Sequence, residues 1–341
     1  MTNGDTKSGS ISADGDSSAI PTTTILGAFA AFIILGSGAS LAIRFTYGEL
    51  APYWSGVLRF GAAALIFWAL LLIRRVPLPR GRALFGAALF GFLSVGAAFL
   101  FVYYGLTKTQ ASLYQTTMAI VPLLTLFFAA AHKLEVLRRR GVFGGILAVA
   151  GIAIAVSGSL SAGVEVSLPH ILAILAAAAC FAEAGIVAKL FPRNHPYATN
   201  AVGMTVGVIM LAAASLIRGE TWTLPSSAET WLAMLYIILG ATVGGFLVYL
   251  FLLKRWTASG TSYGFVLIPI GTVVLASLLT DETISLIFLV GAAVVLAGVY
   301  VGAIMPAKKP AQEVAEKPAI PEEIEPDAEN IQVRPGLPTC V

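Results

Sequence analysis

Two stretches of the sequence decide the fold: FLFVYYGLTKTQASLYQTTMAIVPLLTLFFAAAHKLE at residues 99–135 and FLVYLFLLKRWTASGTSYGFVLIPIGTVVLASLLTDE at residues 246–282. They match at a shift of 147 residues, and the aligned pairs include Phe99 with Phe246, Lys108 with Arg255, Pro122 with Pro269 and Glu135 with Glu282. Self-similarity at a fixed spacing indicates an internal duplication. Both stretches are mostly apolar, so the duplicated unit is a string of hydrophobic segments.

The composition of the whole chain is that of a membrane protein. Of its 341 residues, 57% are hydrophobic and only 11% are charged, and the mean hydropathy is +0.87. A soluble domain is about 45–50% apolar and about 25% charged. A helix needs about 20 apolar residues to span a bilayer, and ten runs of that kind occur, at 24–43, 52–73, 83–103, 112–131, 142–160, 171–190, 198–217, 231–253, 261–280 and 284–304. The alternating pattern of a membrane β-barrel is absent from the sequence, so we expect helices.

The duplication gives each half five spans. Further matches, at shifts of 146 and 144 residues, pair Ile25 with Ile171 and Pro52 with Pro196. Because five is odd, the second half enters the membrane from the side opposite to the first. The predicted fold is therefore an all-α integral membrane protein with ten transmembrane helices, built as two inverted five-helix repeats. Inverted repeats are typical of secondary transporters, whose substrate site lies near the midplane between the repeats.

Lysine and arginine indicate the orientation. With a cytoplasmic N-terminus, twelve of them fall in cytoplasmic loops and three in outer loops, the three being Arg44, Lys108 and Arg218. Positively charged loops favour the cytoplasmic side. We therefore expect a multi-pass protein of the plasma or inner membrane with both termini in the cytoplasm.

Four regions follow from these boundaries. Residues 1–21 are predicted to be a disordered cytoplasmic tail, 22–160 the first repeat, 161–305 the second repeat, and 306–341 a second disordered cytoplasmic tail. The last region is rich in Pro, Glu and Lys and cannot bury enough apolar area to fold.

Several motifs resemble those of the drug/metabolite transporter (DMT) superfamily, in its EamA-like branch with two EamA repeats. The segment 101–106 with Pro122, the pair Leu58-Arg59, and Glu135 followed by Gly144 match that family's patterns, and Glu282 with Gly291 repeats the last of them. The resemblance implies ten helices, inward termini, a central cavity, and proton- or gradient-linked movement of small metabolites, often outward.

Glu183 is the only acidic residue well inside a predicted span. A carboxylate within the membrane is costly and suggests a function by default. Glu183 could bind a substrate ammonium group, or it could take up a proton and couple transport to a gradient. The alternative is a structural carboxyl group that is hydrogen-bonded between helices.

The fourth and ninth spans begin with polar residues and then reach a proline. Gln115 and Thr116 precede Pro122, and Tyr263 precedes Pro269. Equivalent proline-interrupted helices in two halves are a sequence indication of a transporter site, so we expect these three polar residues to line a cavity and the two prolines to break or gate their helices. The alternative is hydrogen bonding between helices.

Three further residues are candidates for the cavity. Arg59 is the only basic residue well inside a span, and it could neutralise a substrate carboxylate or brace a helix. Tyr104 and Tyr249 could line the same cavity, although aromatic residues also gather at membrane interfaces.

Enzymatic functions find little support. The motifs H-E-x-x-H, G-x-S-x-G and G-x-x-x-x-G-K-[ST] do not occur in these 341 residues, so neither a cofactor, nor a metal site, nor ATP-driven pumping is predicted.

We expect a gradient-driven transporter of small polar metabolites such as amino acids, working as an exporter by alternating access. Its expected partners are lipid, substrate and a coupling proton, without nucleic acid, and the chain could be a monomer or a homodimer. The alternative is an intramembrane enzyme or flippase partner acting on a lipid-linked substrate; the acidic residues that would support it, Glu220, Glu229, Asp281 and Glu282, are interpreted as solvated loop charges.

Overall fold

The computed structural model describes residues 22–137, 139–255, 261, 264–280, 282 and 284–304, and within them the regular structure is helical. Among the described residues, eight helical stretches are long and apolar enough to cross a membrane, and two shorter apolar helices, Gly264–Leu279 and Leu286–Gly302, fall where the last two spans are predicted. The predicted ten-helix membrane fold is thereby confirmed. In chain order the elements are α1 (Thr22–Ser37), α2 (Ala39–Thr46), α3 (Pro52–Ile73), α4 (Arg82–Gly91), η1 (Phe92–Ala97), α5 (Ala98–Leu106), α6 (Ala111–Met118), α7 (Val121–Ala131), α8 (Arg139–Ser161), α9 (Leu168–Leu190), α10 (Pro196–Ile217), α11 (Ala228–Leu235), η2 (Tyr236–Gly244), α12 (Gly245–Arg255), α14 (Gly264–Leu279), α15 (Leu286–Val299) and η3 (Tyr300–Ile304).

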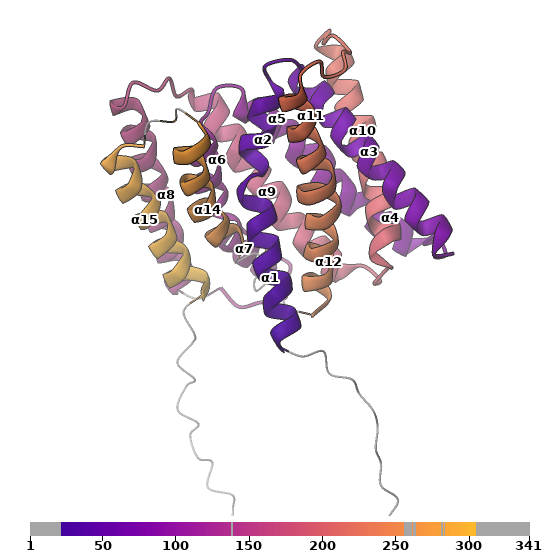
Figure 1. The fold of residues 1–341 in the computed structure, drawn as a ribbon. Helices are drawn as coiled ribbons and strands as arrows, with labels where there is room; N and C mark the ends of the chain where they lie inside the picture. Colours follow the sequence, from indigo (N-terminus) through magenta and orange to yellow (C-terminus); the bar gives the residue numbers. More distant parts are fainter. Residues whose placement is uncertain are drawn as a thin grey trace, which may run out of the picture. The chain divides into compact units, whose positions relative to one another are not determined.

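The two halves interlock. We call α1 to α8 the N-half and α9 to η3 the C-half. The most extensive contacts are between halves: α8 with α15, α3 with α10, and α5 with α9. The contact of α5 with α9 is mirrored by that of α12 with α1, as expected when the third span of each half meets the first span of the other. Figure 1 shows α1 beside α12 and the pair of α8 and α15 at one side of the bundle.

Glycine lets the pair of α8 and α15 approach closely. A Cβ atom placed on Gly298 would lie 2.7 Å from the backbone of α8, and one on Gly151 would lie 2.5 Å from the backbone of α15. Small residues at membrane helix interfaces allow this approach and take the place of a hydrophobic driving force. These glycines therefore fasten the fifth span of one half to the fifth span of the other.

Several spans are interrupted instead of straight. The first divides at Gly38 into α1 and α2, and the fourth divides at Ala119 and Ile120 into α6 and α7. The third and eighth spans each contain a π-helical segment, η1 and η2, at nearly equivalent places in the two halves. π-Helical turns are rare and often occur at functional sites.

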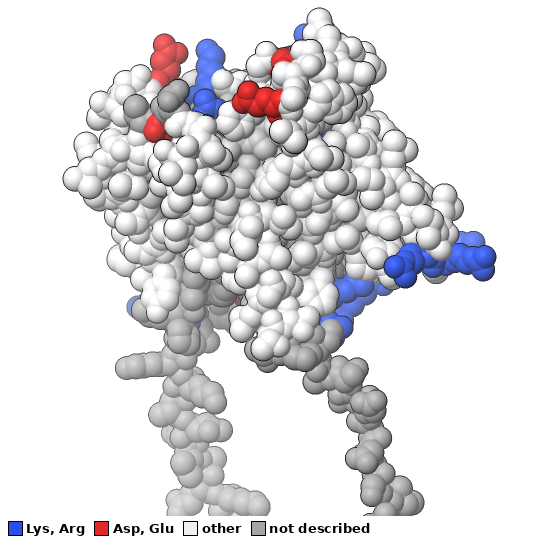
Figure 2. Space-filling model, viewed as in Figure 1, with Lys and Arg blue, Asp and Glu red and all other residues white. Residues whose placement is uncertain are grey.

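Charges of opposite sign gather at the two ends of the bundle. On the face seen in Figure 2, Lys and Arg gather at the end at which α1 begins, whereas the Asp and Glu side chains lie at the other end beside a few basic ones. We call the first the basic end and the second the acidic end. The acidic end contains the loops 47–51, 107–110, 162–167 and 218–227, together with the described residues 280, 282, 284 and 285.

Candidate functional site

A cavity lies in the middle of the bundle, between the two halves. Its volume, measured as the space open to the centre of a water-sized sphere, is about 100 Å³, which is enough for several waters or a small ligand. Its lining comes from α1, α2, α3, η1, α5 and α6 of the N-half and from α9, η2, α12 and α14 of the C-half. A site shared by inverted halves is the arrangement expected of a secondary transporter.

The two π-helical segments contribute to the wall of this cavity. Ser94 of η1 and Ala241 of η2 both line it. Each segment carries a hydroxyl group that donates to a backbone carbonyl one turn earlier: Ser94 Oγ donates to Phe90 O at 2.6 Å, and Thr242 Oγ1 donates to Ile237 O at 2.6 Å. The hydroxyls thus satisfy carbonyl groups at π turns, where the regular helical pattern is disturbed.

Aromatic rings from both halves form a large part of the cavity lining. Phe32 of α1 stacks on Tyr249 of α12 with centroids 5.7 Å apart, and it meets Phe265 of α14 edge-on at 5.8 Å. Phe181 of α9 extends this row of rings: its ring centroid lies 5.8 Å from that of Phe265 and 5.6 Å from that of Phe99 of α5. Such ring pairs are specific contacts that order a site. The cavity is therefore apolar over most of its area and interrupted by a few polar groups.

Arg59 supplies the positive charge of the cavity. The residue is only 2% exposed, and its Nε donates to Thr242 Oγ1 of η2 at 2.6 Å. The guanidinium carbon lies 4.7 Å from the centre of the Phe60 ring and 4.8 Å from that of Phe99, so cation–π attraction also holds it. Nη1 is buried without a hydrogen-bond partner in the described part of the chain.

The structure brings three of the predicted site residues together and separates others. Arg59, Gln115 and Tyr249 line the central cavity. Gln115 Nε2 also donates to Gly36 O across the cavity wall at 3.4 Å. Thr116, the next residue, faces another way and lines an apolar cleft formed with α14 and α15, together with Pro269.

The two prolines behave differently. At Pro122 the predicted break is present, because α6 ends at Met118 and α7 begins with this proline in its first turn. At Pro269 the prediction of a break differs from the structure, since α14 runs through it. Proline is tolerated inside a membrane helix where neighbouring groups stabilise the local backbone; in the turn that contains Pro269, Ser37 of α1 and Thr272 donate to Ile268 O at 3.3 and 3.2 Å.

Glu183, Tyr104 and Tyr263 do not join the described cavity lining. Glu183 lies 2.7 Å from His132 Nε2, just beyond the end of α7 at the basic end, and its side chain is 27% exposed. Tyr104 stacks on His170 near the acidic end, with centroids 4.4 Å apart. Tyr263 lies outside the described residues.

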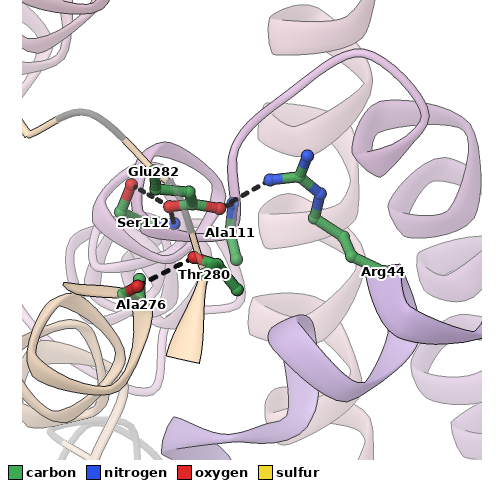
Figure 3. A network of polar contacts seen from close by, with 6 residues as sticks. All are labelled: Arg44, Ala111, Ser112, Ala276, Thr280 and Glu282. Atoms are coloured by element: carbon green, nitrogen blue, oxygen red, sulfur yellow. Dashed lines mark hydrogen bonds and ion pairs between the residues drawn. The ribbon is translucent and has the colours of Figure 1, made fainter. Parts of the chain in front are cut away.

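A second feature is a polar network at the acidic end, drawn in Figure 3. Glu282 accepts bonds from Ala111 N at 2.8 Å, from Ser112 N at 3.3 Å and from Ser112 Oγ at 2.8 Å, and it pairs with Arg44 at 2.5 Å. The N-cap residue of α6, Gln110, makes no side-chain cap of its own. A carboxylate from the C-half therefore caps a helix of the N-half.

Two more carboxylates do the same between the halves. Glu220 accepts from Tyr53 N at 3.1 Å and Trp54 N at 2.8 Å, at the start of α3. Glu49 accepts from Ser227 N at 3.1 Å and from Thr230 Oγ1 at 3.0 Å, before and within α11. Hydrogen bonds from these serine and threonine groups lower the pKa of Glu49 from 4.5 to about 2.

These contacts correct the prediction that the acidic loop residues are merely solvated. Glu220 and Glu282 cap helices of the opposite half. Glu229 is exposed, as predicted, and Asp281 lies outside the described residues. The carboxylates tie the two halves together at the acidic end.

Sequence reasoning missed Thr242 and most of the aromatic lining. The internal repeat pairs Phe99 with Phe246, and both line the cavity, so the repeat itself carried a usable signal. Thr242 gave none, because a single threonine in an apolar run looks like any other. Its role depends on the π turn that brings its hydroxyl to Arg59.

Comparisons with known proteins agree with the two-repeat fold. A family model described as the EamA-like transporter family matches residues 22–157 and 168–303. The curated protein named "Uncharacterized inner membrane transporter YedA", of Escherichia coli K12, is 29% identical over 75% of this chain and 83% of its own length. "Uncharacterized transporter YyaM" of Bacillus subtilis 168 is 25% identical over 78% of this chain and 89% of its own length. A solved crystal structure covers 82% of this chain and 96% of its own with a TM-score of 0.62 at 20% identity, which supports the fold alone.

Proposed function

Because the chain belongs to the EamA-like transporter family, we propose that it is a gradient-driven secondary transporter of small polar metabolites, such as amino acids or related compounds. We propose that it exports them by alternating access. It is a multi-pass membrane protein whose relatives are named as transporters, and no observation favours the alternative of an enzyme or flippase partner.

The central cavity carries the proposal. Its wall is shared by helices of both halves, so a change in the angle between the halves would alter access to it from either end. Two similar halves in opposite orientations can exchange conformations, and that exchange opens a midplane site to alternate sides of the membrane. The carboxylate caps at the acidic end are contacts that such a motion must break and remake.

Transport can be tested without knowing the cargo. Proteoliposomes that contain the purified chain are loaded with a polar metabolite extract, an ion gradient is imposed without ATP, and released compounds are identified by mass spectrometry. We expect a small set of metabolites to leave faster than from protein-free vesicles. Equal release from both preparations under every gradient would contradict the proposal.

Glu183 is proposed as a proton-coupling group, acting together with His132. The two side chains are 2.7 Å apart and partly exposed, so a proton can reach them from the basic end. Glu183→Gln should abolish flux driven by a pH gradient and leave exchange of substrate intact. Glu229→Gln, at the exposed acidic end, is the matched control. Undiminished pH-driven flux in the Glu183 variant would exclude the coupling role.

The orientation is also proposed. We place the basic end, both termini and the tails at 1–21 and 306–341 in the cytoplasm of a cell with the protein in its plasma or inner membrane, because Lys and Arg favour that side. Single cysteines at Arg74 and Glu229 test this with a membrane-impermeant reagent in intact spheroplasts. Only the cysteine at position 229 should react, and labelling at position 74 would reverse the topology.

A further inference from the structure

Arg59 differs from every other lysine and arginine that the structure describes. It is buried, whereas the others are partly or fully exposed and lie towards the two ends of the bundle. The preference for positive loops explains cations at the ends, but it gives no reason for one in the wall of the central cavity. A guanidinium inside the membrane is costly and needs a compensating partner.

The protein supplies only part of that compensation. Thr242 and the rings of Phe60 and Phe99 contact the guanidinium group, and the buried hydroxyl of Tyr103 also interacts with it, yet Nη1 has no hydrogen bond of ordinary geometry within the described residues. No carboxylate contacts Arg59 in that part of the chain, since Arg44 pairs with Glu282 and His132 with Glu183. Buried charges are ordinarily paired with an opposite charge.

The acidic residues are positioned elsewhere. Between residues 22 and 305 the chain has eight of them, namely Glu49, Glu135, Glu165, Glu183, Glu220, Glu229, Asp281 and Glu282. None appears among the residues that line the cavity. A substrate ammonium group would therefore meet aromatic rings, Gln115 and Ser94 there, but no described carboxylate.

We propose that the cargo is an organic anion, with one carboxylate that binds Arg59, an aromatic or otherwise apolar body that lies against the rings, and no ammonium group. The proposal rests on the proposed transport function and narrows it, because it excludes zwitterionic amino acids as the preferred cargo. The carboxylate supplies both the missing counter-charge and an acceptor for Nη1.

A second cavity, at the basic end, is lined by positive charges that would attract the same anionic cargo. It is lined by Lys189, Arg193 and Lys254, together with Asn194 and apolar residues of α4 and α9. Cations that line a cleft raise the local concentration of anions. An anion that enters from this end would thus meet positive charge before it reaches Arg59.

The test compares ligands with the same phenyl body and different charge. Binding of 3-phenylpropionate, 3-phenylpropionamide, L-phenylalanine and phenethylamine to the purified full chain is measured by isothermal titration calorimetry. One charged hydrogen-bonded contact corresponds to roughly a tenfold to hundredfold difference in affinity. We expect 3-phenylpropionate to bind at least about tenfold more tightly than each of the other three. Equal or tighter binding of the zwitterion or the amine, or no binding of the anion, would overturn the proposal.

Variants of Arg59 test whether this side chain is responsible. Arg59→Met should lose the preference for 3-phenylpropionate over its amide, and Arg59→Lys should retain part of it. A preference that survives in Arg59→Met would overturn the assignment. The comparison of anion and amide in the unmodified protein needs no variant, so a misfolded Arg59→Met leaves the proposal testable.

The release experiment separates this inference from the proposed function. Release of zwitterions alone from metabolite-loaded vesicles would leave the transporter standing and overturn the anionic cargo. Anion-selective binding without release of any compound would overturn the transport function and leave the anion site at Arg59 standing.

Discussion

Replacing Glu282 by glutamine should weaken the tie between the halves at the acidic end. The carboxylate is 4% exposed and receives two backbone N–H groups and one hydroxyl from the start of α6, in addition to Arg44 (Figure 3). Glutamine has nearly the same shape, so Glu282→Gln removes the charge and leaves a neutral oxygen as acceptor. The variant therefore measures what the negative charge contributes to capping α6.

The magnitude follows from the geometry. A hydrogen bond to a charged group contributes about 1.5–3 kcal/mol, and a charge near a helix N-terminus about 0.3–2 kcal/mol. Arg44 is 39% exposed, so its ion pair adds at most about 1 kcal/mol. These terms overlap and glutamine keeps part of the bonding, which gives about 2 kcal/mol for the substitution, or a fall of about 4 °C in Tm.

The assay is thermal unfolding of the purified protein in detergent, followed by tryptophan fluorescence. Glu229→Gln is the matched control, because Glu229 lies at the same end and is exposed, and we expect it to change Tm little. Arg44→Gln should cost clearly less than Glu282→Gln if capping dominates. The reasoning is refuted if Glu282→Gln lowers Tm no more than Glu229→Gln, or if Arg44→Gln lowers it as much as Glu282→Gln.

Three other substitutions give independent checks. Thr242→Val removes the hydroxyl that accepts from Arg59 and should destabilise the protein by about 1.5–3 kcal/mol, measured as a lowered Tm against the wild type. Gly298→Ala should push α15 away from α8 and lower the free energy of unfolding by about 1–3 kcal/mol, because the new Cβ would lie 2.7 Å from the α8 backbone. Gly61→Ala is the control: its Cβ would meet no atom within 4 Å, so we expect a neutral or slightly stabilising effect in the same assay. The pKa of Glu49 is lowered from 4.5 to about 2, so the contribution of its carboxylate to folding stability is present above pH 4.5 and is lost as the pH falls through 2. The difference in Tm between the wild type and Glu49→Gln should therefore shrink over that pH range and stay constant above it.

The sequence predicted the spans and the duplication because both are written in regular patterns. Apolar runs of sufficient length mark helices in lipid, and the match of Pro122 with Pro269 marks equivalent segments. The same patterns could not tell what each proline does. Pro122 follows a break in its span, whereas α14 runs through Pro269, in a turn where Ser37 and Thr272 donate to Ile268 O. Ser37 is distant from Pro269 in sequence, so no local pattern encodes its contact with this turn.

The central cavity was predictable only in part for a related reason. Gln115 and Tyr249 could be selected because a polar or aromatic group in an apolar span is conspicuous. Whether such a residue faces the cavity depends on its position around the helix relative to the other half. Thr116 adjoins Gln115 and yet lines a different cleft.

Arg59 and Glu183 show why depth along a span does not by itself identify a membrane-buried charge. Arg59 lies seven residues from the start of α3 at the acidic end, and Glu183 lies seven residues from the end of α9 at the basic end, so both are about 10 Å along their helices from an end. Nevertheless Arg59 is 2% exposed, whereas the side chain of Glu183 is 27% exposed and has His132 beside it. Depth sets the cost of isolating a charge, but the neighbouring helices decide whether it is isolated. Because α7 ends where Glu183 can meet His132, the carboxylate has a partner within the protein, while Arg59 has no acidic partner among its described neighbours and leaves that position to a ligand.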